Sequence, residues 1–148
     1  MLKFSINKIC SYEHLKRNLD YYNDYFLPPL TEVPGDVDKY AEKLFMNANN
    51  FEIINENKTR LGMICFYSND TKSNIGYITL LVVEKEYSNS GIGSILIKYA
   101  EEFAKKENIN KMKLEVVKNN EKAIKFYKKH SYTIAKENEY SYYMEKDI

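Results

Sequence analysis

The chain has few of the residues on which small domains often depend for cross-links and metal sites. Its 148 residues include two cysteines, Cys10 and Cys65, which lie far apart in the sequence, and two histidines. A disulfide framework or a zinc site needs more cysteine and histidine residues at closer spacing. We therefore expect no metal site and two free thiols that are buried as small apolar side chains.

Long apolar segments and an excess of one charge are also missing. No run approaches the roughly 20 apolar residues of a membrane-spanning helix, and residues 1–10 lack the apolar core of a signal peptide. Lys and Arg number 22 against 21 Asp and Glu, so the net charge of +1 favours neither nucleic acid nor a membrane surface. These absences predict a cytoplasmic protein, and abundant Asn, Lys, Ile and Tyr favour a bacterial source.

The chain has no internal repeat or linker, and its length suits a single domain over residues 1–148. One helix is predicted after the N-cap Ser11, with Phe26 on its inner face and Pro28-Pro29 as its end, and a second after Asp36 or Asp38. Alternation of apolar and polar residues predicts strands at 2–6, 51–54, 61–67, 75–83, 112–116, 132–134 and 140–144.

The segment Ser88-Asn89-Ser90-Gly91-Ile92-Gly93-Ser94 joins the strand at 75–83 to a helix that extends to about residue 106, with Asn108 as a left-handed stop. A Gly-x-Gly turn that opens a helix presents unpaired backbone N–H groups at the positive end of the helix dipole. Such groups bind phosphate oxygens. The segment therefore predicts a ligand with phosphate groups, although a tight turn without a ligand stays open at this point.

Two nucleotide-binding motifs that contain similar turns do not fit. The dinucleotide-binding motif needs a third glycine at position 96, where this chain has Leu96. The P-loop needs Gly-Lys-Ser/Thr, whereas Gly93 is followed by Ser94 and Ile95. The phosphate-bearing ligand must therefore be sought in another class.

A second pattern lies about 30 residues beyond the glycine turn. A strand at 111–117 is followed by Asn119 and Asn120, either of which could cap a short helix, by Ala123, and by Tyr127 four residues later. Together the two motifs resemble the GNAT superfamily of acyl-CoA-dependent acetyltransferases. The resemblance covers residues 75–145 well and the N-terminal half by element order only.

The resemblance implies an α+β fold of three layers. About four helices pack on both faces of a mixed, mostly antiparallel sheet of about six to seven strands. The strands at 75–83 and 111–117 splay apart, and acetyl-CoA occupies the gap. The residues implied to contact acetyl-CoA are Leu81, Val82, Val83, Ser88, Asn89, Ser90, Gly91, Ile92, Gly93, Ser94, Asn120 and Tyr127.

Each part of this set has an implied role. Backbone groups of 81–83 would pair with the pantetheine arm, and the amides of 89–94 would hold the pyrophosphate. Gly91 and Gly93 would allow close approach, because a Cβ atom would push the phosphates away. Asn120 would lie near the pantetheine or adenosine, and Tyr127 near the thioester sulfur.

The reaction implied by the resemblance is N-acetylation of a primary amine on a small molecule, which could be an amino sugar, a polyamine or an amino-acid-like compound. The amine attacks the thioester directly once the two are held in contact. An N–H of the strand ending at Val83 stabilises the carbonyl oxygen as it gains negative charge. Tyr127 then protonates the leaving thiolate. The alternatives are a peptide or protein N-acetyltransferase and a non-catalytic acyl-CoA-binding sensor or interaction module. Either a monomer or a homodimer is possible.

Two positions depart from the family pattern. Ser88 stands where Arg or Gln is usual, so a long side chain that would brace the loop or reach phosphate is missing. Lys85, Lys98 and Lys122 are nearby cations that could compensate. Ser131 stands where the short helix usually ends in Gly, and a left-handed Ser costs about 1 kcal/mol relative to Gly.

The general base and the acceptor site are less defined. Family members often carry an acid where this chain has Tyr77, whose pKa is high for a base at neutral pH. Tyr77, as a base or as the holder of a water molecule, and Glu115, the nearest acid on the neighbouring strand, are the candidate catalytic residues beside Tyr127, with bulk water and the C-terminus as further candidates. The segment 21–32 combines aromatic and acidic residues, which suits a cationic amine or a sugar ring, although Tyr22, Phe26 and Leu30 could instead simply pack on the sheet. His14 and His130 are expected at the surface or at helix caps.

Overall fold

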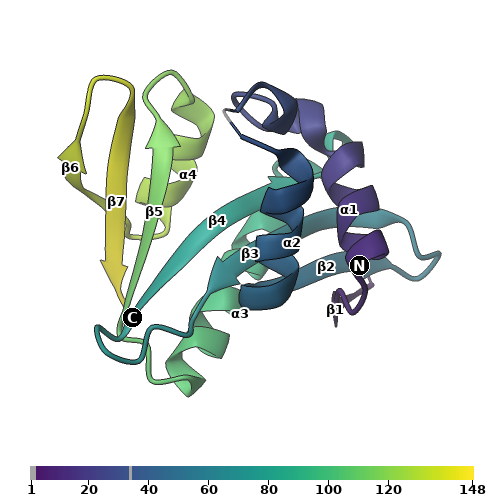
Figure 1. Cartoon of the computed structure of the whole chain (residues 1–148), viewed down its shortest axis with the longest axis horizontal. Coiled ribbons are helices and arrows are strands. Elements are labelled where there is room, and N and C mark those ends of the chain that lie inside the picture. The colour runs from purple at the N-terminus through teal and green to yellow at the C-terminus, as the bar shows by residue number, and fades with distance from the viewer. Residues whose placement is uncertain (1–2, 34) are drawn as a thin grey trace.

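The computed structural model describes residues 3–33 and 35–148. They form a seven-stranded sheet in the order β1-β2-β3-β4-β5-β7-β6, in which β4 and β5 are parallel and the other neighbouring pairs are antiparallel. The expected mixed, mostly antiparallel sheet is thereby confirmed (Figure 1). The strands are β1 (Phe4–Lys8), β2 (Asn49–Asn55), β3 (Arg60–Tyr67), β4 (Ile75–Val83), β5 (Lys111–Val117), β6 (Thr133–Glu137) and β7 (Ser141–Asp147).

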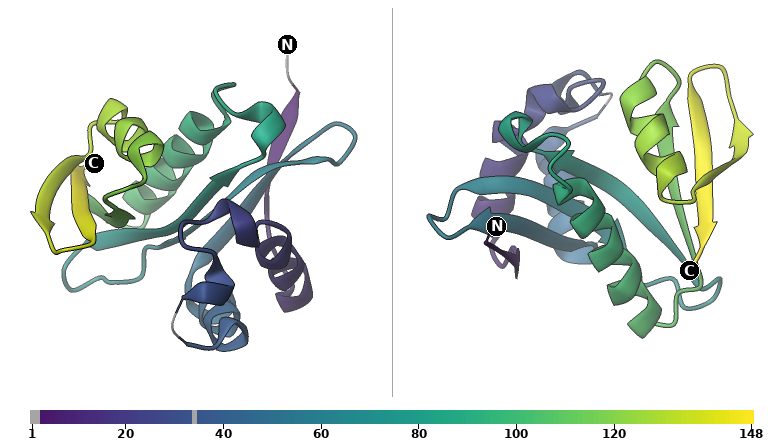
Figure 2. Two further views of the ribbon diagram at one scale, coloured as in Figure 1. Left: turned by 90° about the horizontal axis from the view of Figure 1, so that it is seen from above. Right: turned by 180° about the vertical axis from the view of Figure 1, so that it is seen from behind.

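Helices cover both faces of this sheet (Figure 2). On one face α1 and α2 enclose an apolar cluster that contains Leu19, Leu44 and Leu80. On the other face α3 and α4 enclose the larger cluster, which contains Leu96 and Leu114. The helices are α1 (Tyr12–Tyr21), α2 (Val37–Asn47), α3 (Ile92–Lys106) and α4 (Glu121–Lys129), with the 3-10 turns η1 (Asn23–Tyr25), η2 (Leu30–Glu32) and η3 (Lys85–Tyr87).

Local side-chain chemistry sets most helix boundaries. Ser11, Asp36 and Asn120 each accept a hydrogen bond from a backbone N–H in the first turn of α1, α2 and α4. Asn108 and Ser131, just beyond α3 and α4, have φ of 65° and 73°. The predicted caps and left-handed residues are confirmed. Of the alternatives that the sequence left open, Asp36 rather than Asp38 caps α2, and Asn120 rather than Asn119 caps α4.

The first helix ends earlier than predicted. α1 stops at Tyr21, and the chain continues through η1, so Phe26 is not on the helix face where we expected it. The Asn23 side chain explains this end, since its Oδ1 accepts from the Thr31 N–H at 3.0 Å and its Nδ2 donates to the Thr31 hydroxyl at 3.1 Å. Such side-chain bonds compete with helix continuation. β1 begins at Phe4, and Leu2 and Pro34 lie outside the described residues.

The two cysteines differ in exposure. Cys65 is buried within β3, as expected, and burial raises the pKa of its thiol. Cys10 is exposed in the turn before α1, where its thiol donates to the Lys8 carbonyl at 3.4 Å, so the prediction of a buried thiol is wrong there. Within the described ranges no helix is long and apolar enough to cross a bilayer, and no three His, Cys, Asp or Glu side chains gather as a metal site.

The parallel strands β4 and β5 pair over only four residues, Ile75–Ile78 with Lys111–Leu114. Directly after this stretch the register between β3 and β4 shifts, which leaves Thr79 as an extra residue of β4. A bulge of this kind bends its strand and increases the local twist. The end of β4 therefore turns away from β5, and the two strands splay as the sequence implied (Figure 1).

Candidate functional site

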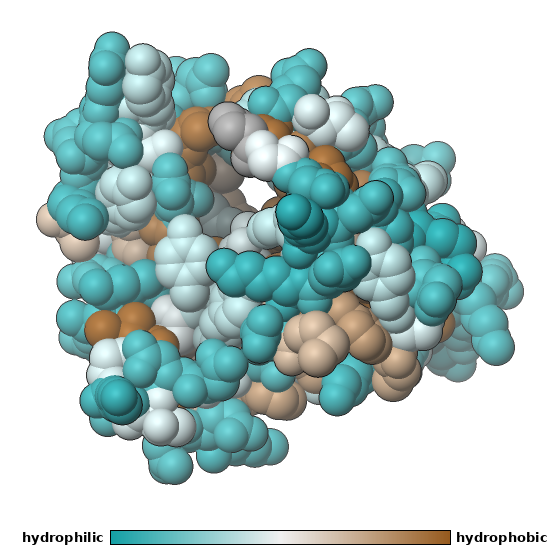
Figure 3. Space-filling model, viewed as in Figure 1, coloured by the Kyte–Doolittle hydropathy of each residue, from teal (hydrophilic) through white to brown (hydrophobic). Residues whose placement is uncertain are grey.

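Two cavities meet in the gap between β4 and β5. The first, of about 590 Å³, lies along the β4–α3 loop and the start of α4, and we call it the loop cavity. The second, of about 550 Å³, lies beneath the segment that joins α1 to α2, and we call it the α1–α2 cavity. Leu81, Asn120, Ala123 and Tyr127 line both. The surface is visibly hollowed between the α1–α2 segment and the β5–α4 region (Figure 3).

The start of α3 forms one wall of the loop cavity. Gly91 is the N-cap of α3 with φ of 90°, and a Cβ atom there would have no neighbour within 4 Å. The backbone N–H groups of 92–94 have no acceptor one turn back, so they are open to an anion. The Ser90 N–H instead donates to the Tyr87 carbonyl at 3.1 Å. Of the backbone amides of 89–94 that we expected to hold a pyrophosphate, the Ser90 amide is thus already bonded within the loop.

Other loop positions have internal roles beyond those implied by the sequence. A Cβ atom on Gly93 would lie 3.0 Å from the Phe126 ring, so close packing against α4 favours glycine there independently of any ligand. Ile92 is 1% exposed and lies in the core, which leaves only its backbone for a ligand. The Ser94 hydroxyl lies 2.9 Å from His130 Nε2, and burial lowers the pKa of His130.

A lysine from α4 reaches the position where the loop lacks its usual long side chain. Lys122 Nζ donates to the Ser88 hydroxyl at 2.7 Å. Lys85 and Lys129 also line the loop cavity, whereas Lys98 does not. The loop cavity is thus lined by three lysines and one acid, Asp24, together with the α3 N-terminus, and this excess of positive charge favours a polyanion.

The backbone of β4 has a free edge along the gap. The Glu84 N–H donates to the Leu61 carbonyl at 2.8 Å, and the Val82 carbonyl oxygen lies against Gly62, so both face β3. Backbone groups of successive strand residues point to opposite edges. Leu81 and Val83 therefore direct their N–H and C=O groups into the gap, and Val82 does not.

Glu84 holds two tyrosines, Tyr21 of α1 and Tyr25 of η1, and Tyr25 also lines both cavities. Its carboxylate accepts from the Tyr25 hydroxyl at 2.6 Å and from the Tyr21 hydroxyl at 2.9 Å. The bond to Glu84, with burial, raises the pKa of Tyr25 to about 12. Lys85 Nζ lies 5.0 Å from the centre of the Tyr25 ring. No sequence pattern indicates this cluster, because its members are far apart in the chain.

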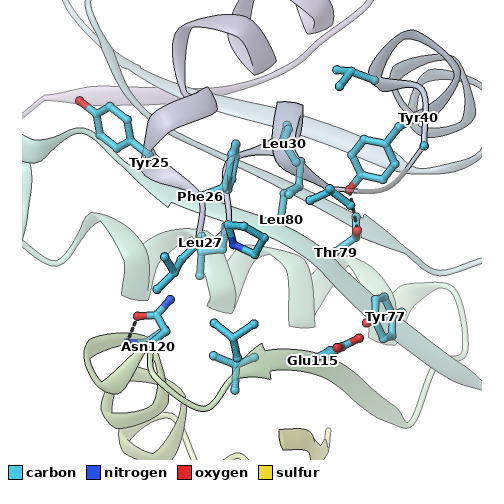
Figure 4. Close-up of a pocket in the computed structure, with 18 of the residues that line it drawn as sticks. Tyr25, Phe26, Leu27, Leu30, Tyr40, Tyr77, Thr79, Leu80, Glu115 and Asn120 are labelled. Atoms are coloured by element: carbon cyan, nitrogen blue, oxygen red, sulfur yellow. Dashed lines mark hydrogen bonds between the residues drawn. The ribbon is translucent and has the colours of Figure 1, made fainter. Parts of the chain in front are cut away.

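Asn120 and Tyr127 lie where the cavities meet. Asn120 Oδ1 accepts from the Ala123 N–H at 3.2 Å, which leaves its amide nitrogen directed toward the cavity (Figure 4). Burial raises the pKa of Tyr127 above its ordinary value, and the nearby Tyr77 raises it further. The Tyr127 hydroxyl therefore remains protonated at neutral pH and can donate a proton.

Tyr77 and Glu115 lie together at one end of the α1–α2 cavity, on β4 and β5 (Figure 4). Burial, with the charge of Glu115, raises the pKa of Tyr77 to about 12. Tyr77 is therefore a hydrogen-bond donor at neutral pH rather than a base. Glu115 is exposed, but its carboxylate points toward Tyr77, so the strand register does bring the two candidates together.

Comparison with known proteins agrees with this geometry. The family model described as the acetyltransferase (GNAT) family matches residues 15–132. The chain belongs to the GNAT acetyltransferase family.

Solved structures of similar overall fold support the GNAT architecture. The PaiA N-acetyltransferase of Thermoplasma acidophilum, solved in complex with coenzyme A, is 20% identical over 99% of this chain and 100% of its own, with a TM-score of 0.77. Naa50 of Arabidopsis thaliana is 24% identical over 99% and 100%, with a TM-score of 0.79. A GNAT-family acetyltransferase of Streptococcus pneumoniae is 21% identical over 99% and 100%, with a TM-score of 0.71.

In this GNAT protein the residues of 21–32 divide between the core and the α1–α2 cavity. Tyr22 and Leu30 are buried, as the packing alternative predicted, and Tyr21 turns toward Glu84. Phe26 lines the α1–α2 cavity, as does Tyr25, but the acids of 21–32 do not. The early end of α1 contributes to this division, because the residues after it form a segment over the cavity instead of a further helical turn.

The two histidines lie outside both GNAT cavities. His14 Nε2 is 3.0 Å from the Glu52 carboxylate on the α1 side of the sheet. His130 is the C-cap residue of α4 and contacts Ser94. Both positions agree with the expected surface or cap roles.

Proposed function

We propose that this GNAT protein transfers the acetyl group of acetyl-CoA to the primary amine of a small molecule. The observation that carries the proposal is that two cavities of different character meet at Tyr127. The sequence leaves amino sugars, polyamines and amino-acid-like amines open as acceptors. The Thermoplasma acidophilum relative, whose structure contains coenzyme A, supports the choice of donor.

The loop cavity has the features that acetyl-CoA requires. The α3 N-terminus and Lys122 suit the pyrophosphate, because both attract anions. The free edge at Leu81 and Val83 suits the amide groups of the pantetheine arm, which can pair with it as a short added strand. With the pyrophosphate and the arm held in this way, the thioester end would lie between the splayed strands, next to Tyr127.

Acetyl-CoA supplies a thioester, whose carbonyl carbon the amine attacks. Glu115, or a water held by Tyr77, takes the proton that the ammonium must lose before attack. A backbone N–H of Leu81 or Val83 donates to the carbonyl oxygen as it gains charge. As the carbon–sulfur bond breaks, the Tyr127 hydroxyl gives its proton to the sulfur. Solvent water takes the second proton of the nitrogen as the amide forms, and Tyr127 regains its proton from solvent.

Removing the Lys122 side chain tests the role of the cavity's positive charge. Lys122→Ala should weaken acetyl-CoA binding about tenfold, since a charge-assisted contact contributes roughly 1.5 kcal/mol. Calorimetric titration measures the change, and Lys125→Ala is the matched control, because Lys125 is exposed on the same helix and outside the cavity. Equal affinities in the two variants would assign Lys122 no part in binding.

Thermal unfolding with and without acetyl-CoA, followed by release of free thiol across an amine panel, tests the proposed function. At 100 times its dissociation constant, acetyl-CoA should add about 2.7 kcal/mol to the free energy of unfolding. Thiol release should then require both acetyl-CoA and an amine. Stabilisation without thiol release would favour the sensor alternative, and no stabilisation would refute acetyl-CoA as a ligand.

A peptide N-terminus is the second candidate acceptor. The Arabidopsis Naa50 structure holds a bisubstrate analogue, CoA-Ac-MVNAL, in a fold that matches this chain with a TM-score of 0.79. Faster acetylation of short peptides than of any free amine in the panel would favour this candidate.

A further inference from the structure

Apolar residues make up somewhat more than half of the lining of the α1–α2 cavity. Phe26 and Leu27 from the extended segment after η1, Leu30 from η2, and Leu80 from β4 gather on one side of it (Figure 4). Leu27 and Val33 are 50% and 41% exposed although they are large apolar residues, and both line this cavity. Exposed apolar groups that rim a cavity are typical of a site that takes an apolar ligand.

Charge is scarce in the same lining. Among the described residues that line the cavity, only Asp36 and Glu115 are charged. Asp36 Oδ1 accepts from the Asp38 N–H at 2.8 Å as the cap of α2, which leaves its other oxygen for a ligand. Glu115 beside Tyr77 is the carboxylate of this described lining that lies next to the gap between β4 and β5.

Two of the other polar groups are already paired, since Tyr40 and Thr79 bond to each other through their hydroxyls at 2.9 Å. The Tyr77 hydroxyl and the Asn120 amide remain as donors in this lining. An amino sugar has more hydroxyls than these groups can pair, and a polyamine has more ammonium groups than two carboxylates can pair.

We infer that the acceptor is a primary amine carried on an apolar body, with the amine beside Glu115 and Tyr77 and the body against Phe26, Leu27 and Leu80. This inference rests on the proposed acetyl transfer and names its acceptor class. The same chemistry occurs in free alkylamines and in peptide N-termini with an apolar first side chain. The acceptor panel below separates these two sources.

Rates with a graded set of acceptors test the inference. Propylamine, hexylamine, leucinamide and a short peptide with N-terminal leucine are compared with glucosamine and spermidine, by thiol release and product mass. Each buried methylene should raise kcat/KM about fourfold, so hexylamine should exceed propylamine tenfold or more and exceed both polar amines. The ratio of kcat/KM for hexylamine to kcat/KM for the leucine peptide shows whether the acceptor is a free alkylamine or a peptide N-terminus, since only the peptide has further peptide groups to bind.

A substitution of Leu27, at the rim of the α1–α2 cavity, tests whether this cavity causes the preference for hexylamine over propylamine. Leu27→Asp should lower kcat/KM for hexylamine about tenfold more than that for propylamine, because the longer chain reaches the rim. The affinity for acetyl-CoA should be unchanged, because Leu27 does not line the loop cavity. Met46→Asp is the control, since Met46 is 76% exposed and lies outside both cavities.

Two failures are distinguishable. Faster transfer to glucosamine or spermidine than to hexylamine, or an unchanged preference in Leu27→Asp, would overturn the apolar acceptor and leave acetyl transfer intact. Acetyl-CoA that binds without transfer to any amine of the panel would instead overturn the proposed function, and the acceptor class with it.

Discussion

Replacing Tyr127 with phenylalanine should lower kcat about 100-fold and leave the affinity for acetyl-CoA unchanged. The hydroxyl lies where the two cavities meet, and a positioned general acid contributes roughly this factor. Phenylalanine keeps the ring that packs against Phe126 and Tyr132, so the fold is retained. Steady-state rates of thiol release and calorimetric titration measure the two quantities.

The protonation state of the Tyr127 hydroxyl predicts how the deficit of the variant depends on pH. Because burial raises the pKa of Tyr127 above its ordinary value, the hydroxyl keeps its proton on the alkaline side of neutrality. The deficit of Tyr127→Phe should therefore be constant from about pH 7 to about pH 9. Tyr140→Phe is the control, since Tyr140 is 71% exposed and lies in neither cavity. Full activity of Tyr127→Phe across this range would remove the residue from the mechanism.

Gly91→Glu should weaken acetyl-CoA binding by roughly 100-fold or more, which corresponds to about 2.7 kcal/mol. The space beside Gly91 is open, so the new carboxylate would extend into the region that we assign to the pyrophosphate and repel it. The left-handed φ of 90° adds strain to any residue with a Cβ atom. Titration with acetyl-CoA measures the loss.

Gly35→Glu is the matched control for this variant. Gly35 has φ of 116°, and a Cβ atom there would have no neighbour within 4 Å, so the substitution carries similar strain and the same added charge. Gly35 lines the α1–α2 cavity rather than the loop cavity. Acetyl-CoA affinity should survive in Gly35→Glu, and equal affinity in both variants would contradict the placement of the phosphates at the α3 N-terminus.

Elements with strong local signals could be predicted from the sequence. β4 and α3 have the predicted bounds, because a β-branched run and a regular apolar face define them within one stretch of chain. The Asn120 cap and the left-handed Ser131 are equally local, since each depends on one side chain or one φ angle.

Features that join distant segments could not be predicted. The bulge at Thr79 depends on how β3 and β4 align, and no residue type signals it. The bonds of Tyr21 and Tyr25 to Glu84, and of Lys122 to Ser88, join residues far apart in the chain. They determine which aromatic residues face the α1–α2 cavity and what replaces the missing long side chain of the loop.

Residue-resolved NMR titration with acetyl-CoA tests most directly whether the donor lies between β4 and β5. Two-dimensional proton–nitrogen spectra report each backbone amide of the protein. The largest shift changes should occur at Leu81, Val83 and 91–94, whose amides face the gap or open α3, and saturate with one ligand per chain. Changes that cluster instead around His14 and Glu52, or no saturable change at all, would contradict acetyl-CoA binding in this gap.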